Sequence, residues 1–195
     1  MGSGRPARGQ ACSVVILLLG LLGMTRPVGA MGADRLPADS SEGLAASGRT
    51  EPVTVTLVAE HSSIQPGGAT RVGVLFEMDE GWHIYAQDPG DAGLPTKIVW
   101  SGLEDAIFGP MQWPAPERFL DPGDIHTFGY HGSVTLARSM QLAPSKIRGA
   151  SVSIHAKVTW LACKEVCLPG SVNLELHLPV SDTPPAFSDH AALFQ

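Results

Sequence analysis

Two segments near the C-terminal end constrain the fold most, because apolar and polar side chains alternate in both, at residues 151–160 and 172–178. Successive side chains of a strand point to opposite faces, so this pattern is typical of a strand with one face on a core and one in water. Further extended segments are predicted at residues 53–59, 72–78, 82–85, 98–100 and 128–142. Seven to nine short strands with frequent turns, and no convincing amphipathic helix, predict an all-β, immunoglobulin-like antiparallel β-sandwich.

Residues 101–127 do not follow this alternation. They contain Pro110, Pro114, Pro116 and Pro122. Proline cannot donate a hydrogen bond to a sheet ladder and is therefore confined to edges and bulges. We expect a long surface excursion here, with a short strand inside it.

The first thirty residues have the features of a secretory signal peptide. Arg5 and Arg8 precede an apolar run at residues 14–23, and small residues lead up to Ala30. The apolar run is too short to span a bilayer, and the small residues suit a signal peptidase. We predict cleavage after Ala30, export to the periplasm, and a disordered leader over residues 31–51, which show no apolar period.

The mature chain is predicted to be one acidic domain over residues 52–180, with a polar tail at 181–195 that frays. The signal peptide carries Arg5, Arg8 and Arg26 and no acid, which leaves 10 basic and 19 acidic residues and a formal net charge of −9. An acidic chain argues against binding to nucleic acid or to anionic membrane surfaces. No second apolar run approaches membrane length, so we expect no membrane insertion of the mature chain. We also expect a monomer.

Cys163 and Cys167 are the two cysteines of the mature chain, since Cys12 leaves with the signal peptide. They lie between the two clearest strands, which predicts a position at the tip of a hairpin. Residues four apart in an extended strand are about 13 Å from each other, whereas a disulfide needs Cα atoms within roughly 4.4–6.8 Å. The segment must therefore curl if these two cysteines are bonded.

Three interpretations of the pair remain open. A structural disulfide closing so small a ring contributes only about 2 kcal/mol, so thiol–disulfide chemistry explains the pair better, with one thiolate attacking and a second thiol resolving. An interaction module with a structural disulfide is the first alternative, and a copper-handling protein is the second, because thiolates suit Cu(I). His61, His126, His131 and His177 show no ligand spacing, so we expect neither a metal nor a cofactor.

Five segments resemble one family, in the same order along the chain. They are residues 81–85 (Gly-Trp-His-Ile-Tyr), 89–95 (Pro-Gly-Asp-Ala-Gly-Leu-Pro), 112–119 (Gln-Trp-Pro-Ala-Pro-Glu-Arg-Phe), 128–132 (Phe-Gly-Tyr-His-Gly) and 159–170 (Thr-Trp-Leu-Ala-Cys-Lys-Glu-Val-Cys-Leu-Pro-Gly). Together they resemble the N-terminal periplasmic domain of the thiol:disulfide interchange protein DsbD and its ScsB-type relatives, over roughly residues 52–180.

The resemblance implies a protein-disulfide reductase or thiol–disulfide oxidoreductase. A membrane-embedded or thioredoxin-like protein would supply electrons, and oxidised periplasmic proteins would receive them. The resemblance also implies that Cys167 forms the mixed disulfide and that Cys163 resolves it. Phe119 best matches an aromatic cap over the pair, and Tyr85 matches an aromatic position near the site. His83 stands where the best-known member has tyrosine.

Family members usually continue into a transmembrane domain and a thioredoxin-like domain, whereas this sequence ends at Gln195. We therefore expect the electron donor to be another protein.

Overall fold

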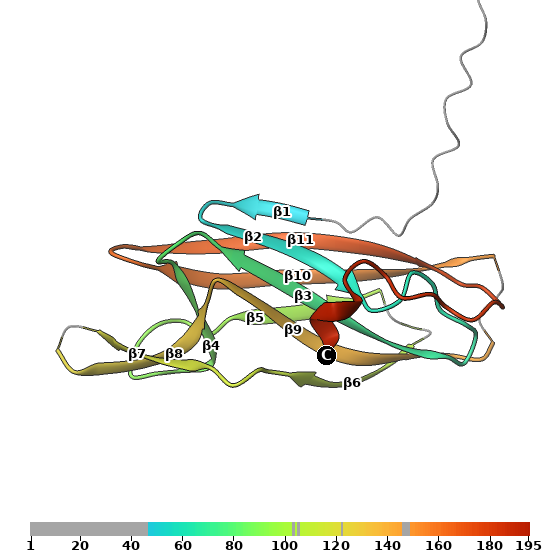
Figure 1. Ribbon diagram of the computed structural model, residues 1–195, viewed down its shortest axis with the longest axis horizontal. Helices are drawn as coiled ribbons and strands as arrows, with labels where there is room; N and C mark the ends of the chain where they lie inside the picture. Colours follow the sequence, from blue (N-terminus) through green and yellow to red (C-terminus); the bar gives the residue numbers. More distant parts are fainter. Residues whose placement is uncertain (1–46, 103, 105, 122, 146–148) are drawn as a thin grey trace, which may run out of the picture. The chain divides into compact units, whose positions relative to one another are not determined.

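The computed structural model describes residues 47–102, 104, 106–121, 123–145 and 149–195, which form two antiparallel sheets packed face to face (Figure 1). The predicted signal peptide and most of the predicted leader lie outside the described residues. The strands are β1 (Ser47–Thr50), β2 (Val53–Ala59), β3 (Ala69–Met78), β4 (His83–Gly90), β5 (Lys97–Ser101), β6 (Ala106–Gln112), β7 (Glu117–Asp121), β8 (Ile125–His131), β9 (Ser133–Leu142), β10 (Ser151–Cys163) and β11 (Cys167–Pro179). A short 3₁₀ helix, η1 (Ala191–Phe194), follows them. The predicted all-β sandwich is confirmed.

The five-stranded sheet has the order β1-β2-β3-β9-β6. The second sheet has the order β11-β10-β4-β8-β7, and β5 also pairs with β10. The strands β10 and β11 form a long hairpin, whose ladder runs without a break from Ser151↔Pro179 to Cys163↔Cys167. Figure 1 shows the tip of this hairpin at the same end of the sandwich as β7 and β8.

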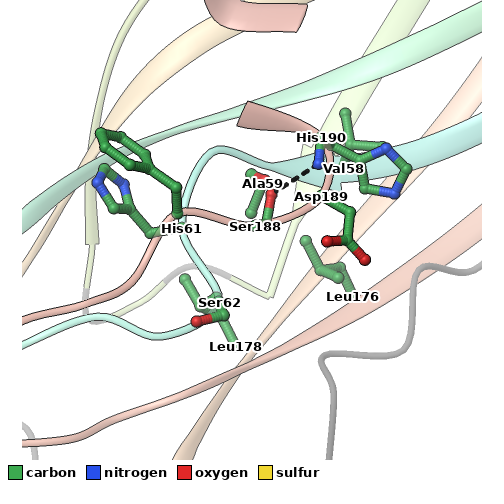
Figure 2. A pocket seen from close by; sticks show the side chains of 10 residues that line it. Val58, Ala59, His61, Ser62, Leu176, Leu178, Ser188, Asp189 and His190 are labelled. Atoms are coloured by element: carbon green, nitrogen blue, oxygen red, sulfur yellow. Dashed lines mark hydrogen bonds between the residues drawn. The ribbon is translucent and has the colours of Figure 1, made fainter. Parts of the chain in front are cut away.

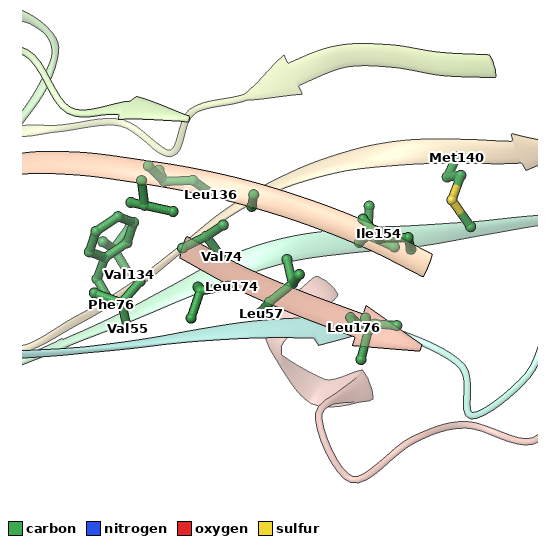
Figure 3. Close-up of a cluster of buried hydrophobic side chains, with 14 of the residues drawn as sticks. Val55, Leu57, Val74, Phe76, Val134, Leu136, Met140, Ile154, Leu174 and Leu176 are labelled. Atoms are coloured by element: carbon green, nitrogen blue, oxygen red, sulfur yellow. The ribbon is translucent and has the colours of Figure 1, made fainter. Parts of the chain in front are cut away.

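The core lies between the sheets and is built from the alternating residues that the sequence indicates. Inward-facing side chains of β2, β3 and β9 meet those of β10 and β11, as the buried cluster in Figure 3 shows. The fully buried members include Val55, Leu57, Phe76, Leu136 and Ile154. Burying an apolar side chain of this size contributes about 1.5–3 kcal/mol, so this interface is the main source of stability.

The proline-containing segment differs from our expectation, because it holds two strands rather than one. Strand β6 pairs with β9 and β7 pairs with β8, and each lies at the edge of its sheet. An edge position tolerates residues that cannot donate to a ladder. The register of β6 shifts between Phe108 and Met111, where Pro110 lies. The prolines therefore restrict this segment to sheet edges without preventing strands.

Two boundaries are also corrected. The expected leader extends to residue 51, but Ser47–Thr50 pairs with β2 and forms the edge strand of the first sheet. The expected frayed tail is instead packed onto that sheet. Phe194 is 4% exposed and joins the outward-facing side chains Val58, Leu75 and Ala137 in a second apolar cluster. Burial of this aromatic ring, together with backbone hydrogen bonds to residues 60–64, thus holds a largely polar segment in place.

Candidate functional site

The cysteine pair closes the tip of the β10–β11 hairpin, as the sequence predicts. Cys163 and Cys167 are partners in the ladder and form a disulfide, with their Cα atoms 4.1 Å apart. So short a separation is typical of a pair that exchanges no backbone hydrogen bonds, in which side chains approach most closely. The curl that a bond requires is provided by the three-residue connection between the strands, residues 164–166.

The two sulfur-bearing residues differ sharply in exposure. Cys163 is 3% exposed, whereas Cys167 is an exposed residue at the start of β11. Ala162 and Ile84, which neighbour each other in the ladder, are fully buried in the core. Because side chains alternate, Cys163 and His83 lie on the outer face of the second sheet. Cys163 is therefore buried by side chains on that outer face rather than by the core.

Tyr85 is one of these outer-face side chains. Its hydroxyl donates a hydrogen bond to Sγ of Cys163 over 3.4 Å. The strand β4 is held in place there because Thr96 donates from Oγ1 to the Tyr85 carbonyl over 2.6 Å. Gly93, at φ +94°, lies so close to the Tyr85 ring that a Cβ atom would be 2.5 Å from it. Burial raises the pKa of Tyr85, which keeps the phenol neutral and able to donate.

His83 connects Phe119 to the cysteine pair. The His83 ring stacks on Phe119, with centroids 4.6 Å apart, and meets Tyr85 edge-on at 5.3 Å. Its backbone lies opposite Cys163 in the ladder between β4 and β10. Phe119, on β7, is half-buried. The structure thus places Phe119 beside the site through His83, and its role as a cap over the sulfur atoms stays a prediction.

The importance of His83 is the main feature that the sequence interpretation missed. His83 and Tyr85 are two residues apart in a strand, and this spacing places both side chains on one face. That spacing is the signal that could have joined the two. Nε2 of His83 is buried without a hydrogen-bond partner. Burial lowers the pKa of His83, and the carboxylate of Asp121 opposes this change more weakly.

The charges of the cysteine loop are arranged asymmetrically. Nζ of Lys164 donates to the carbonyl oxygen of Glu80 over 3.1 Å, which ties this ammonium to the turn between β3 and β4. The Lys164 side chain crosses Gly81, where φ is +80° and a Cβ atom would be 2.8 Å from Cε of the lysine. Glu165 is exposed at the tip. The loop is thus anchored at one side and open to solvent at the other.

Gly170 supports the hairpin a few residues from Cys167. It is the ladder partner of Trp160, and a Cβ atom at residue 170 would collide with the indole ring. Trp160 is buried and meets Phe76 edge-on, with centroids 6.0 Å apart. Of the four tryptophans expected in the core, Trp160 is buried there, and Trp82, Trp100 and Trp113 are partly buried against it.

A separate cavity of about 440 Å³ lies near the opposite end of the hairpin (Figure 2). The residues that line it include the apolar Val58, Leu176 and Leu178 and the polar His61 and Asp189. Leu178 pairs with Val152, near the far end of the ladder from the cysteines. Within the described part of the chain, no group of His, Cys, Asp and Glu residues is arranged to hold a metal ion. Nor does any described helix have the length and apolar character needed to cross a membrane.

Comparison with known proteins agrees with this geometry. Residues 51–179 match the model of the family described as "Thiol:disulfide interchange protein DsbD, N-terminal". The crystal structure of the N-terminal periplasmic domain of ScsB from Proteus mirabilis aligns with a TM-score of 0.50 and 23% identity, over 70% of this chain and 49% of that one. This chain therefore spans about half the length of that relative.

Two further solved structures are more distant. The reduced N-terminal domain of Neisseria meningitidis DsbD aligns with a TM-score of 0.33 and 18% identity, over 67% of this chain and 89% of that one. The GAE domain of yeast GGA1 aligns with a TM-score of 0.39 and 8% identity, over 70% of this chain and the full length of that domain. No curated protein sequence matches the chain.

Proposed function

This chain belongs to the family of the N-terminal domain of the thiol:disulfide interchange protein DsbD, and we propose that it is a thiol–disulfide exchange module that works through Cys163 and Cys167. It receives two electrons from a membrane-embedded or thioredoxin-like donor and passes them to oxidised proteins of the periplasm. The observation that carries this proposal is the disulfide at an otherwise regular hairpin tip, with one cysteine exposed and the other buried beside a hydrogen-bond donor.

The difference in exposure supports distinct roles for the two cysteines. In the reductive half-reaction, a donor thiolate attacks Sγ of the exposed Cys167, the bond to Cys163 breaks, and Cys163 leaves as a thiolate. The Tyr85 hydroxyl stabilises that thiolate, because it already donates to the same sulfur. A second donor thiol then displaces Cys167, which leaves both cysteines reduced and the donor oxidised.

The delivery half-reaction runs in the opposite sense. The Cys167 thiolate attacks a disulfide of the acceptor protein and forms a mixed disulfide, with one acceptor sulfur leaving as a thiolate. Cys163 then attacks Cys167, which re-forms the internal disulfide and releases the acceptor in its dithiol form. Two electrons leave the domain in each cycle, and no cofactor is needed.

Phe119 acts in this proposal as a shield for the pair. Its ring lies against His83, which neighbours Cys163 in the ladder. An apolar ring close to a sulfur disfavours the thiolate by desolvation, so a partner that displaces the ring exposes and activates the pair together. Residues 1–30 are proposed to direct export to the periplasm, where such exchange takes place.

Trapping experiments test the roles of the cysteines. Cys163→Ala keeps the exposed attacking sulfur and lacks the resolving one, so it should accumulate a mixed disulfide with a thioredoxin-like partner. Cys167→Ala should trap little, since its remaining cysteine is buried. Non-reducing gel electrophoresis with mass spectrometry measures both. Equal trapping by the two variants would show that the assignment of attack to Cys167 is wrong.

A second measurement addresses exchange itself. A structural disulfide has a reduction potential below about −300 mV and resists glutathione. Titration of wild-type protein against glutathione should therefore find a higher potential than this limit. A lower value would favour an interaction module with a structural disulfide instead.

A further inference from the structure

His83 lies in a position from which it can act on the cysteine pair through its two aromatic neighbours, Tyr85 and Phe119. One face of its imidazole stacks on Phe119, and its side meets the edge of Tyr85. Tyr85 in turn donates to Sγ of Cys163. The same imidazole therefore contacts both the proposed shield and the residue that supports the buried sulfur.

The surroundings of this imidazole suit its neutral form. An imidazolium carries a proton on both ring nitrogens, and Nε2 of His83 is buried with no acceptor nearby. A buried donor without a partner costs about 1–3 kcal/mol, and more when it is charged. Protonation is therefore compatible with this environment only if Nε2 gains access to water. The stacked ring of Phe119 covers one face of the imidazole, so its displacement is the movement that we connect with this access.

The groups on the neighbouring strands do not supply a direct partner. On β7, Asp121 attracts the imidazolium from a distance, and it accepts a hydrogen bond from Thr127 over 3.0 Å. Also on β7, Glu117 pairs with His131 of β8 over 3.0 Å. His131 is the ladder partner of His83, so protonation of both would place two cations side by side.

The remaining titratable groups around His83 are either uncharged or held by other partners. On β4 itself, burial raises the pKa of Tyr85, which stays uncharged. On β10, Cys163 is bonded in the oxidised state. In the hairpin loop, the ammonium of Lys164 is held on the Glu80 carbonyl oxygen. The charged or titratable side chains that face His83 from the neighbouring strands are therefore His131 and Asp121.

We propose that His83 is a positioning residue for exchange at Cys163 and Cys167: its neutral ring holds Phe119 in place, and its protonation releases that ring and opens the pair. The disulfide is then more accessible to an attacking group in an acidified compartment than in a neutral one. This inference rests on the proposed function, because it concerns regulation of the same cysteine pair.

The test measures how fast a phosphine reduces the oxidised protein. Tris(2-carboxyethyl)phosphine attacks one sulfur and displaces the other as a thiolate, and water then releases the second thiol and the phosphine oxide. The disulfide takes up two electrons, and no thiolate of the reagent enters the rate. His83→Phe keeps an aromatic ring against Phe119 and cannot titrate. Dividing the wild-type rate by the His83→Phe rate at each pH cancels the titration of the phosphine itself.

The ratio should rise between about pH 8 and about pH 5, by up to about tenfold for each unit by which the pKa of His83 in the closed form lies below that in the open form. His131→Gln serves as the matched control, because it removes the neighbouring histidine and keeps His83, so the rise should persist. A ratio that stays flat, or a rise that is lost in His131→Gln, would overturn the proposal.

A second measurement needs no change at His83. The titration of its ring is followed by NMR in wild-type protein and in Phe119→Ala, where removal of the stacked ring should move the pKa up toward its ordinary value near 6.5. An unchanged pKa would also overturn the proposal. Neither readout involves a protein partner, so a failure to exchange with protein partners would refute the proposed function and leave these results standing.

Discussion

Removal of the Tyr85 hydroxyl isolates one contact at the cysteine pair. In Tyr85→Phe the ring, its burial and its contact with Gly93 are kept, and the hydrogen bond to Sγ of Cys163 is lost. In the disulfide this bond is to a neutral sulfur and is weak. In the reduced protein it is made to a thiolate once Cys163 ionises. The substitution therefore destabilises the reduced form more than the oxidised form, and the reduction potential should fall.

The size of the fall follows from the geometry. Hydrogen bonds to charged groups contribute about 1.5–3 kcal/mol, and a donor–acceptor distance of 3.4 Å to sulfur places this one at the lower end. For a two-electron couple, about 1.4 kcal/mol corresponds to about 30 mV, or a tenfold change in the equilibrium constant. We expect Tyr85→Phe to lower the potential by about 30 mV at a pH where the Cys163 thiol is ionised.

Equilibration with defined glutathione ratios measures this change, and Tyr130→Phe is the matched control. Tyr130 is as buried as Tyr85, but its hydroxyl donates to the Pro114 carbonyl over 2.9 Å rather than to sulfur. Both substitutions remove one buried hydroxyl, so both should lower stability somewhat. Only Tyr85→Phe should change the potential. Equal potentials in the two variants would refute the assigned role of the Tyr85 hydroxyl.

Three further outcomes are expected. Phe119→Ala should speed alkylation of the reduced cysteines by iodoacetamide. Because the ring is only half-buried, the loss in free energy of unfolding should stay well below the roughly 3–5 kcal/mol of a fully buried Phe→Ala change. Unchanged alkylation together with a large loss of stability would exclude a shield. Gly170→Ala should lower the free energy of unfolding by about 1–3 kcal/mol, because the added methyl group meets the Trp160 ring. Urea unfolding should show this loss as a lower midpoint with an unchanged m value. The lowered pKa of His83 means that the unfolded state binds more protons, so the melting temperature should fall as pH decreases below about 6.5, and His83→Phe should flatten this dependence.

Much of the fold could be predicted because alternation reports burial directly. The ladder of β10 and β11 places Ile154 and Leu176 in the core and leaves His155 and Glu175 outside, in agreement with the sequence pattern. The same argument fails for residues 106–121, since edge strands have one unpaired side and tolerate proline, so local composition hides them. The packed C-terminal segment was missed because backbone hydrogen bonds to residues 60–64 and the buried ring of Phe194 hold it, and neither produces a periodic apolar pattern.

At the site, sequence reasoning singled out Cys163, Cys167, Tyr85 and Phe119, but it gave His83 no role and did not show how these residues contact one another. The spacing of Cys163 and Cys167 predicts a curl at a hairpin tip, which the structure confirms. Which cysteine is buried depends on the outer face of the sheet, and that face is built by β4, β7 and β8, far away in sequence. The contact between His83 and Phe119 joins β4 to β7 across β8. Such a contact requires the strand order, and no local motif encodes it.

The unbroken ladder between β10 and β11 has a kinetic consequence. Thirteen residue pairs hold the two backbones in register, and the cysteines are the last pair. The hairpin therefore keeps both sulfur atoms within reach of each other when the bond between them is open. Well-oriented groups on one chain react as if present at effective concentrations of about 10⁵ M or more. In the proposed cycle, a partner captured on Cys167 would consequently be expelled quickly, and the domain would suit brief encounters in which each partner departs as soon as its bond has been transferred.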